Sequence, residues 1–448
     1  MIKEIKWHNH DILGNLVLNF EKTTGEIYNT IILAGENGCG KTTILSTLST
    51  FLSLGSFEPF EYIKYKIDEN EYKIFSSPKL NSEFGFHVRE NVLSGESKNI
   101  TTNKNNNFTI LQNDNNDIRK YGCVYSKARS GFQTKMVQST TTQQLDAEKY
   151  NQDDSEDFTS IKQLLVDIDA QDNSEWMELC RANTGETINS FLSRSKLSRF
   201  RKAFNDFFEN VRFNKIDQTS SSEKRIVFTK HNNDIAIDSL STGEKQIVFR
   251  GAFLLKNSNN ISKGIVLIDE PELSMHPRWQ KKILSYYRNL FTQGGNQSAQ
   301  IFIATHSEYV IQEALQDKNN VLVILLKDNQ GIIESSKITT PFILSLITDA
   351  EVNYNAFGIS TIDYHILLYG YLQNKIGQNS SIMACDNYIS RSQHYNVSIH
   401  NKPYQYNNRT YQTLPTYIRN TIDHPDAGHS FTPEELETSI QLLIELCR

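Results

Sequence analysis

Cysteine is scarce in this 448-residue chain, and its spacing excludes two kinds of structural site. The five cysteines stand at positions 39, 123, 180, 385 and 447, so no two of them form a C-x-x-C pair. Such spacing favours neither a zinc site nor a disulfide framework. We therefore expect reduced thiols of the kind found in cytoplasmic proteins.

Long hydrophobic runs are also missing. No stretch approaches the roughly 18 consecutive apolar residues that indicate a membrane-spanning helix. Lys3, Glu4 and Lys6 interrupt the first residues, where a secretory signal would carry its apolar segment. We therefore expect a soluble cytoplasmic protein with no membrane partner.

An excess of positive charge is absent too. The chain has 46 Lys and Arg against 52 Asp and Glu, which gives a net charge of -6 and a pI of about 6.0. General nucleic-acid binding is therefore not indicated, and any basic surface must be local. One local cluster could contact a nucleic acid or a partner, although a solvated helix face is the simpler interpretation. Its members are Arg194, Lys196, Arg199, Arg201 and Lys202.

The clearest motif is Gly35–Thr42, which fits the phosphate-loop pattern G-x-x-x-x-G-K-[ST]. Residues 28–34 predict a buried strand before it, and the apolar spacing of residues 42–54 predicts a helix after it. In such a loop the backbone N–H groups face phosphate oxygens, Lys41 reaches the β- and γ-phosphates, and Thr42 binds Mg²⁺. The sequence therefore predicts a site for ATP and Mg²⁺. The expected nucleotide contacts are Asn37, Gly38, Gly40, Lys41, Thr42 and Thr43.

Two apolar strands with polar ends are predicted later in the chain. Residues 264–268 lead into Asp269 and Glu270. A carboxylate at such a strand end can hold Mg²⁺ through water, and the next one can orient or deprotonate the attacking water. Residues 300–304 lead into His306, which can read the γ-phosphate. Taken alone, His306 would fit a histidine satisfied by backbone groups better than a functional one.

A helix start at Leu240-Ser241-Thr242-Gly243-Glu244 completes the set. Ser241 and Glu244 have the spacing of a capping box, which alone would indicate only a well-capped helix. Together and in this order, the four motifs resemble the ABC-type ATPases, in particular the soluble branch of Rad50, SMC, RecF and the OLD-like proteins. The resemblance covers about residues 1–55 and 225–330.

This resemblance implies roles for individual residues. Asp269 would be the magnesium-linked acid, Glu270 the catalytic base and His306 the switch histidine. Ser241 and Gly243 would act in trans, on ATP held by a second copy of the chain. The protein would then be a homodimer, or a higher oligomer, closed around ATP.

We expect an α/β fold whose ABC-type P-loop head, a mixed sheet with helices, spans residues 1–55 and 225–335. Residues 56–224 are predicted as an inserted middle lobe that includes helices and an exposed, mobile Asn-rich loop between Asn91 and Lys120. Residues 336–448 are predicted as a mainly α-helical domain. The middle lobe lacks sustained heptads and cannot form the long arms of Rad50 or SMC.

The middle lobe departs from the family at its glutamine loop. The predicted strand 122–125 ends in Ser126-Lys127-Ala128-Arg129, and Gln133 is only a weak candidate for the glutamine that senses the γ-phosphate.

The C-terminal region carries Arg419-Asn420-x-x-x-His424, which is similar to the R-N-x-x-x-H motif of HEPN ribonucleases. That similarity implies metal-free RNA cleavage, with His424 as acid or base and Arg419 stabilising the developing charge. Alternatively, both side chains stabilise a helix that Pro425 ends. No acidic Toprim pattern follows the head, so the nuclease domain of OLD proteins is not expected.

The whole layout resembles the PtuA-type ATPases of Septu and retron antiphage systems, which work with an HNH nuclease. We therefore expect an ATP-hydrolysing protein that dimerises around ATP and regulates a nuclease effector in phage defence. Two alternatives stay open. The same ATPase could gate a HEPN-like ribonuclease in its own chain, or it could bind nucleic acid directly in DNA repair.

Overall fold

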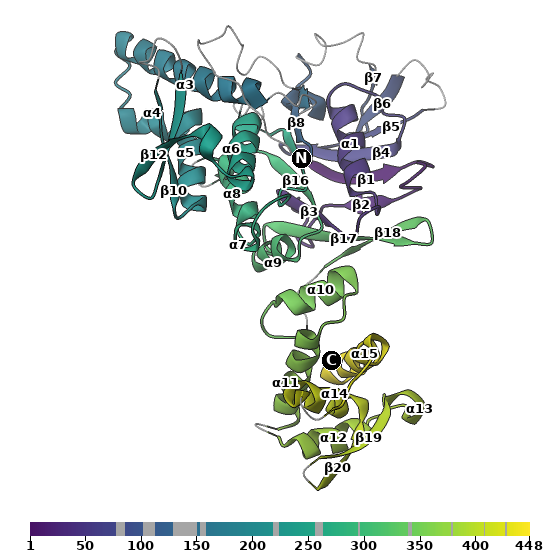
Figure 1. The fold of residues 1–448 in the computed structure, drawn as a ribbon. Coiled ribbons are helices and arrows are strands. Elements are labelled where there is room, and N and C mark those ends of the chain that lie inside the picture. The colour runs from purple at the N-terminus through teal and green to yellow at the C-terminus, as the bar shows by residue number, and fades with distance from the viewer. Residues whose placement is uncertain are drawn as a thin grey trace. The chain divides into compact units, whose positions relative to one another are not determined.

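The computed structural model contains two compact units, Met1–Ile338 and Thr339–Arg448 (Figure 1). Each unit has a hydrophobic core of its own. The structure describes residues 1–77, 86–101, 113–128, 150–152, 158–217, 224–255, 263–293, 296–338, 343–377, 380–406, 408–425 and 428–448.

A seven-stranded sheet forms the centre of the first unit, in the order β18-β17-β3-β16-β13-β8-β9. All neighbouring strands are parallel except the β17–β18 pair, so the predicted mixed sheet is confirmed. Its central strands are buried along their whole length, as their apolar runs predict. The bounds are β3 (Thr30–Ala34), β8 (Cys123–Ser126), β9 (Tyr150–Gln152), β13 (Ile265–Asp269), β16 (Gln300–Thr305), β17 (Val321–Asn329) and β18 (Ile332–Lys337).

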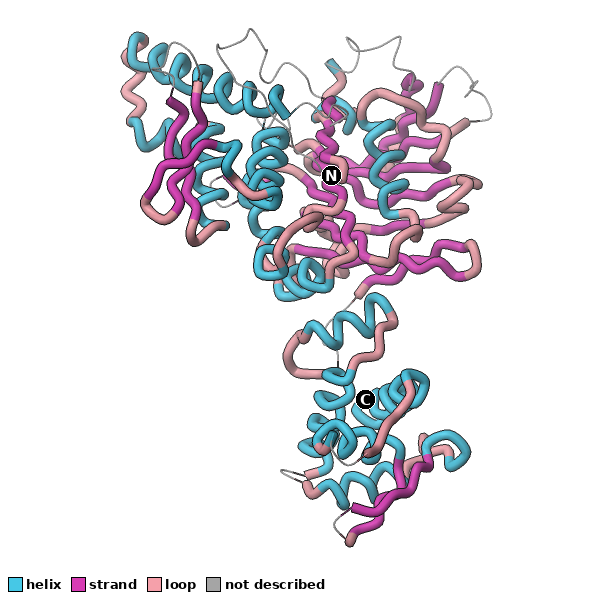
Figure 2. The backbone as a smooth tube through the Cα atoms, in the orientation of Figure 1, coloured by secondary structure: helices cyan, strands magenta, loops and turns pink. Residues whose placement is uncertain are grey.

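A second, antiparallel sheet has the order β2-β1-β4-β5-β6-β7 (Figure 2). Its side chains share one core with helix α1 (Lys41–Leu52) and with the parallel sheet. The Trp7 indole of β1, for example, donates to Thr47 Oγ1 of α1 at 3.2 Å. The bounds are β1 (Ile2–Trp7), β2 (Val17–Asn19), β4 (Phe60–Ile67), β5 (Asn70–Phe75), β6 (Phe86–Asn91) and β7 (Ser97–Thr101).

The predicted Asn-rich loop contains regular structure. Strand β7 pairs with β6 across residues 97–101, and the 3₁₀ helix η2 covers Ile118–Tyr121. The loop interpretation was therefore wrong for these segments, because the β6–β7 ladder satisfies the backbone whatever the side chains are. Strands β4, β5, β6 and β7 lie in the segment predicted as the middle lobe, but they belong to the same sheet as β1. Residues 102–112 lie outside the described part of the chain.

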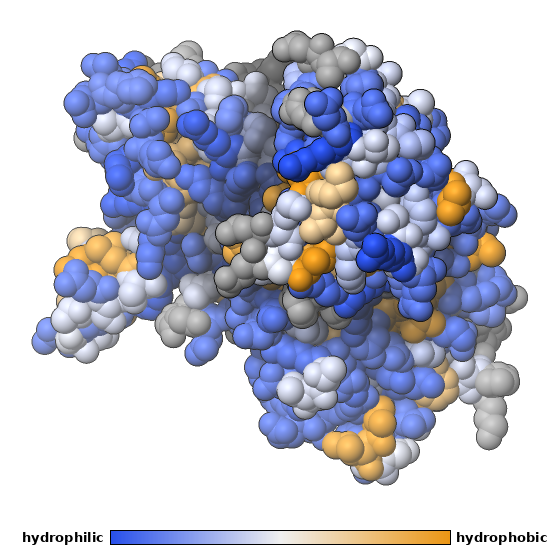
Figure 3. All heavy atoms as spheres, turned by 90° about the horizontal axis from the view of Figure 1, so that it is seen from below, coloured by the Kyte–Doolittle hydropathy of each residue, from blue (hydrophilic) through white to orange (hydrophobic). Residues whose placement is uncertain are grey.

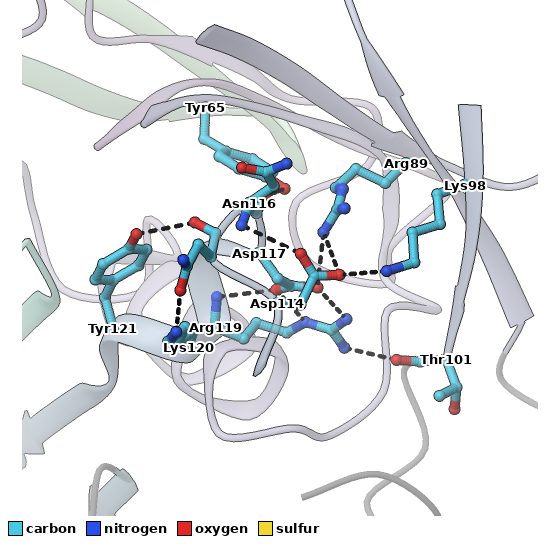
Figure 4. Close-up of polar contacts among 11 residues, drawn as sticks. Tyr65, Arg89, Lys98, Thr101, Asp114, Asn116, Asp117, Arg119, Lys120 and Tyr121 are labelled. Carbon is cyan, nitrogen blue, oxygen red and sulfur yellow. Dashed lines mark hydrogen bonds and ion pairs between the residues drawn. The ribbon is translucent and has the colours of Figure 1, made fainter. Parts of the chain in front are cut away.

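A buried polar cluster joins β6, β7 and η2 (Figure 4). The Arg119 guanidinium donates to both carboxylate oxygens of Asp117, at 2.9 and 2.7 Å, and to the Thr101 carbonyl at 2.8 Å. Arg89 lies 3.1 Å from the carboxylate of Asp114. Charged groups this deeply buried are stable only when they are paired, so the cluster ties the three elements together.

The described part of residues 158–236 forms a lobe of helices beside a three-stranded sheet. The apolar stripe from Leu197 to Val211 predicts one helix, but α5 ends at Phe207 and Val211 begins β10. Phe208 is already extended, and Phe213 of β10 packs against the rings of Phe200 and Phe228. The bounds are α3 (Phe158–Arg181), α4 (Ile188–Arg194), α5 (Lys196–Phe207), β10 (Val211–Asp217), β11 (Arg225–Lys230) and β12 (Asn233–Ala236).

Four further helices and three short elements are found in the described part of the first unit. They are η3 (Ile237–Ser239), α6 (Thr242–Leu255), α7 (Pro277–Gln280), α8 (Ile283–Leu290), β14 (Thr292–Gln293), β15 (Asn296–Gln297) and α9 (Glu308–Gln316). The sequence predicts one helix over residues 279–291, and the structure has two in this region, α7 and α8.

The second unit is mainly helical, as predicted. It contains α10 (Asp349–Phe357), α11 (Ile362–Ile376), α12 (Ile382–Arg391), α13 (Val397–His400), the hairpin β19 (Asn401–Tyr406) and β20 (Arg409–Thr413), α14 (Leu414–Asp423) and α15 (Pro433–Cys447). The spacing of Thr432 and Glu435 predicts a capping box, and this capping box is present at the start of α15.

The apolar residues of 342–347 predict a helix, but none forms in the described residues 343–347. The first helix begins at Asp349 instead, because the Thr348 side chain caps it and Glu351 accepts the N–H groups of Ile343 and Leu344. Phe342 lies outside the described residues.

Hydrophobic side chains form separate patches on a mainly hydrophilic surface in the view of Figure 3. Within the described residues, no helix combines the length and the apolar character that crossing a membrane requires.

Candidate ATP-binding site

The phosphate loop joins the carboxyl end of β3 to the start of α1, as predicted. Gly35, Gly38 and Gly40 all have positive φ angles, of 149°, 88° and 85°. At Gly35 a Cβ atom would lie only 2.3 Å from the carbonyl oxygen of Leu326 on β17. Glycine is therefore required there by backbone conformation and by space.

Lys41 is buried at the start of α1, and its ammonium turns back into the loop. It donates to the carbonyl oxygens of Gly35 at 2.8 Å and of Glu36 at 2.7 Å. Phosphate oxygens attract this ammonium more strongly than the carbonyls do, because they carry negative charge and the carbonyls are neutral. The arrangement therefore fits a lysine that receives phosphate.

Thr42 and Asp269 meet beside the loop, although 227 positions separate them in the sequence. The Thr42 hydroxyl donates to Asp269 Oδ2 at 2.9 Å. Asp269 Oδ1 is buried and makes no hydrogen bond within the described residues. Burial raises the pKa of Asp269, an effect that the Thr42 hydrogen bond opposes. A hydroxyl and a carboxylate with an unused buried oxygen suit Mg²⁺, which prefers oxygen ligands.

Glu270 and His306 lie at the ends of the adjacent strands β13 and β16. Oε1 of Glu270 is 3.5 Å from Nδ1 of His306. Glu270 has a φ of 44°, a backbone conformation that is uncommon for residues other than glycine. Such strain is found most often at functional sites.

Glu272 is a site residue to which the sequence reasoning assigned no role. Its buried Oε1 accepts from the Thr305 hydroxyl at 2.6 Å and from the backbone N–H of His306 at 3.1 Å. The same oxygen lies 3.7 Å from Nδ1 of His306, and burial raises the pKa of Glu272. The signal for Glu272 in the sequence was its position in the acidic run Asp269-Glu270-Pro271-Glu272.

Arg250 of α6 was missed entirely. Its buried guanidinium donates to the carbonyl oxygens of Asp269 at 2.7 Å and of Glu270 at 2.9 Å. A further hydrogen bond goes to the carbonyl oxygen of Lys127, just after β8. An arginine among the apolar residues of a predicted helix was the only hint in the sequence.

Ser241 and Gly243 stand at the start of α6. The Ser241 N–H donates to Glu244 Oε2 at 2.8 Å and the Ser241 hydroxyl accepts from the Glu244 N–H at 3.4 Å, so the predicted capping box forms. Among the described contacts, none joins Ser241 to the phosphate loop of its own chain. A Cβ atom at Gly243 would lie 3.0 Å from the Trp279 ring, which places the start of α6 directly against α7.

The family resemblance implies a glutamine at the end of β8, but this strand ends in Ser126. Its register beside Ile268 of β13 brings the Ser126 hydroxyl to the site edge of the sheet. That hydroxyl is buried and has no hydrogen-bond partner among the described residues. Arg129 and the weak candidate Gln133 lie outside the described residues.

The basic cluster at residues 194–202 is not a continuous exposed patch. Lys196 and Arg199 are only 3% and 7% exposed. Arg194 pairs with Glu175 and Glu186. The contacts therefore favour a structural role over nucleic-acid binding.

The C-terminal motif lies at the end of α14. Arg419 pairs with Asp423 at 2.7 Å and donates to Asn420 Oδ1 at 2.8 Å. Buried Asn420 bonds to the Tyr404 hydroxyl, and His424 caps the helix. These contacts match the structural alternative, and the ribonuclease role stays a prediction.

Comparison with known proteins gives one partial family match. Residues 180–312, which include Ser241, Glu270 and His306, match a family model described as "AAA domain, putative AbiEii toxin, Type IV TA system". Among solved structures, a crystal structure of an SMC head bound to the C-winged helix domain of ScpA covers 75% of this chain and 98% of its own, with 14% identity and a TM-score of 0.43.

Two relatives match most of the chain. The Septu protein PtuA of Bacillus thuringiensis is 24% identical over 328 residues, covering 70% of this chain and 74% of the relative. The "Retron Vc95 probable ATPase" of Vibrio cholerae serotype O1 biovar El Tor is 24% identical over 373 residues, covering 67% and 70%. The resemblance expected from the motifs is confirmed, and this chain is a homologue of the Septu PtuA and retron ATPases.

Proposed function

We propose that this protein binds and hydrolyses ATP with Mg²⁺, dimerises around ATP and regulates a nuclease effector in antiphage defence. One observation carries the ATPase proposal. The fold brings Lys41, Thr42, Asp269, Glu270 and His306 from three separate parts of the chain to the carboxyl ends of β3, β13 and β16.

In this proposal the phosphate loop and Lys41 bind the triphosphate. Thr42 and Asp269 hold Mg²⁺, which would neutralise the charge that develops on the phosphoryl oxygens. Glu270 accepts the proton of the attacking water, and His306 beside it contacts the γ-phosphate. Arg250 holds the backbone of Asp269 and Glu270 in place.

We infer the homodimer because no described contact joins Ser241 to the phosphate loop of its own chain. Among the described residues, the Ser241 hydroxyl forms a hydrogen bond only with Glu244, and it acts there as an acceptor, so the hydroxyl can still donate to a second copy. In the dimer, Ser241 and Gly243 of one copy close the ATP site of the other.

The Glu270→Gln variant tests both the proposed ATP hydrolysis and the proposed ATP-dependent dimer. It should bind ATP, lose hydrolysis by at least about 100-fold because a general base contributes 10²–10⁴-fold, and accumulate as an ATP-dependent dimer in size-exclusion chromatography. Glu334→Gln, an equivalent change at an exposed position of β18, should behave as the parent protein. Absence of ATP-dependent association would show that the trans role of Ser241 is wrong.

The nuclease part rests on the homology with PtuA and retron ATPases. An HNH-type protein encoded beside this chain should co-purify with it. Its cleavage of DNA should differ severalfold between complexes with the parent chain and with Glu270→Gln in the presence of ATP. Equal cleavage in both complexes would contradict regulation by the ATPase.

A further inference from the structure

A pocket of about 630 Å³ lies beside Ser241, on the side of α6 that faces α7. It is lined from four places in the chain: the turn after α5, the β11–β12 turn, the start of α6, and α7 with the residues that follow it. The residues that matter for charge are Lys230, His231, Arg278, Lys281, Lys282 and two glutamates, Glu209 and Glu244. Its wall is therefore predominantly basic.

Most of these charges already have partners. Lys230 pairs with Glu244 at 2.9 Å, and Lys282 lies 3.9 Å from Glu209. Lys281 stacks over the Tyr309 ring, at 4.9 Å from its centroid. Arg278 differs, because it is exposed and its guanidinium forms no hydrogen bond or ion pair with any described residue.

The proposed ATP site has the opposite charge. Asp269, Glu270 and Glu272 gather at its edge, whereas Lys41 is the cation that faces the phosphates. The guanidinium of Arg250 is occupied by backbone carbonyls. Because ATP carries more negative charge than one Mg²⁺ neutralises, a further cation would stabilise the closed site.

We propose that Arg278 of one copy donates to the triphosphate of the ATP held by Lys41 of a second copy. This inference rests on the proposed ATP-dependent dimer. Arg278 and Ser241 line the same pocket, so we expect a triphosphate that binds the Ser241 hydroxyl to lie near the guanidinium as well. A guanidinium suits this task because its planar fork can bind two phosphate oxygens at once.

The first test compares variants in the Glu270→Gln background. Arg278→Ala should require about 10- to 100-fold more protein for ATP-dependent association, because a hydrogen bond to a charged group is lost. Binding of a fluorescent ATP analogue to the monomer should not change. Arg278→Lys should recover part of the association, and Lys318→Ala, an exposed charge change outside the pocket, should have no effect.

The second test asks whether the arginine acts in trans. A Lys41→Ala copy keeps Arg278 but cannot hold ATP. An Arg278→Ala copy holds ATP but lacks the arginine. Mixed together in the Glu270→Gln background, they restore one complete site. Mass photometry, with one copy enlarged by a fused tag, should therefore detect an ATP-dependent heterodimer that neither copy matches alone.

The outcomes separate the two proposals. If Glu270→Gln itself does not associate with ATP, the proposed dimer fails and this inference fails with it. If Glu270→Gln associates and Arg278→Ala associates equally well, only the inference is overturned. Loss of ATP binding by the Arg278→Ala monomer, or no heterodimer in the mixture, would likewise overturn it.

Discussion

At the scale of single residues, burial moves the pKa of several side chains away from the value that they have in water. His365 of α11 is the clearest case outside the ATP site. Its Nε2 shares a hydrogen bond with the Ser439 hydroxyl at 2.9 Å, and its Nδ1 is buried with no partner among the described residues. Burial lowers the pKa of His365 to about 3. The imidazole is therefore neutral in the folded protein.

This burial predicts a pH dependence of stability. As pH falls below the ordinary histidine value of about 6.5, the unfolded chain binds a proton that the folded chain rejects until about pH 3. His365 should thus reduce the free energy of unfolding of the second unit by about 1.4 kcal/mol per pH unit in this window. Urea unfolding at several pH values gives the free energy of unfolding as a function of pH. This plot should have a shallower slope for His365→Gln, whereas exposed His394→Gln should keep the parent slope.

At the scale of elements, Arg250 connects α6 to β13 and to the end of β8. Three backbone carbonyls depend on one guanidinium, so the helix that starts with Ser241 is linked mechanically to the strand end that carries Asp269 and Glu270. In the proposed mechanism, this link would connect a contact at Ser241 to the carboxylates of Asp269 and Glu270.

Loss of this link should affect hydrolysis more than binding. Arg250→Lys keeps the charge but cannot reach three carbonyls in the same geometry. We expect kcat for ATP hydrolysis to fall at least about tenfold, as small misplacements of reacting groups do, with ATP affinity within about twofold of the parent. Equal losses in affinity and kcat would indicate a general structural defect instead.

The polar cluster of Figure 4 acts at the same scale, since it holds β6, β7 and η2 together. Asp117→Ala would leave Arg119 buried without its carboxylate and should cost about 3–5 kcal/mol of unfolding free energy. Lys98→Ala removes an exposed pair with Asp114 and should cost at most about 1 kcal/mol. Chemical denaturation of both variants tests the difference, and similar costs would show that burial of the Asp117 pair contributes little.

At the scale of the whole molecule, the two units have separate cores, and the boundary lies at residues 338 and 339. All the described site residues for ATP belong to the first unit. A fragment of residues 1–338 should therefore fold and bind ATP with an affinity within about threefold of the full chain, because no binding contact is lost. Titration with a fluorescent ATP analogue measures this, and failure of a folded fragment to bind would show that the second unit contributes to the site.

The sequence by itself determined the features whose signal is contiguous. The phosphate loop needs glycines, a lysine and a threonine in one short run, and buried parallel strands need apolar runs. These local patterns located β3, α1, β13 and β16, and with them Lys41, Thr42, Asp269, Glu270 and His306. The capping boxes of α6 and α15 were equally local.

Only the tertiary structure decided the features that depend on distant partners. Arg250 binds a carbonyl 123 positions away, Thr42 meets Asp269 across 227 positions, and β7 pairs with β6 despite its polar side chains. Burial also turned the basic run at Lys196 and Arg199 from a candidate binding surface into part of the interior. Spacing along the chain carries no information about such contacts, because the fold alone sets which surfaces meet.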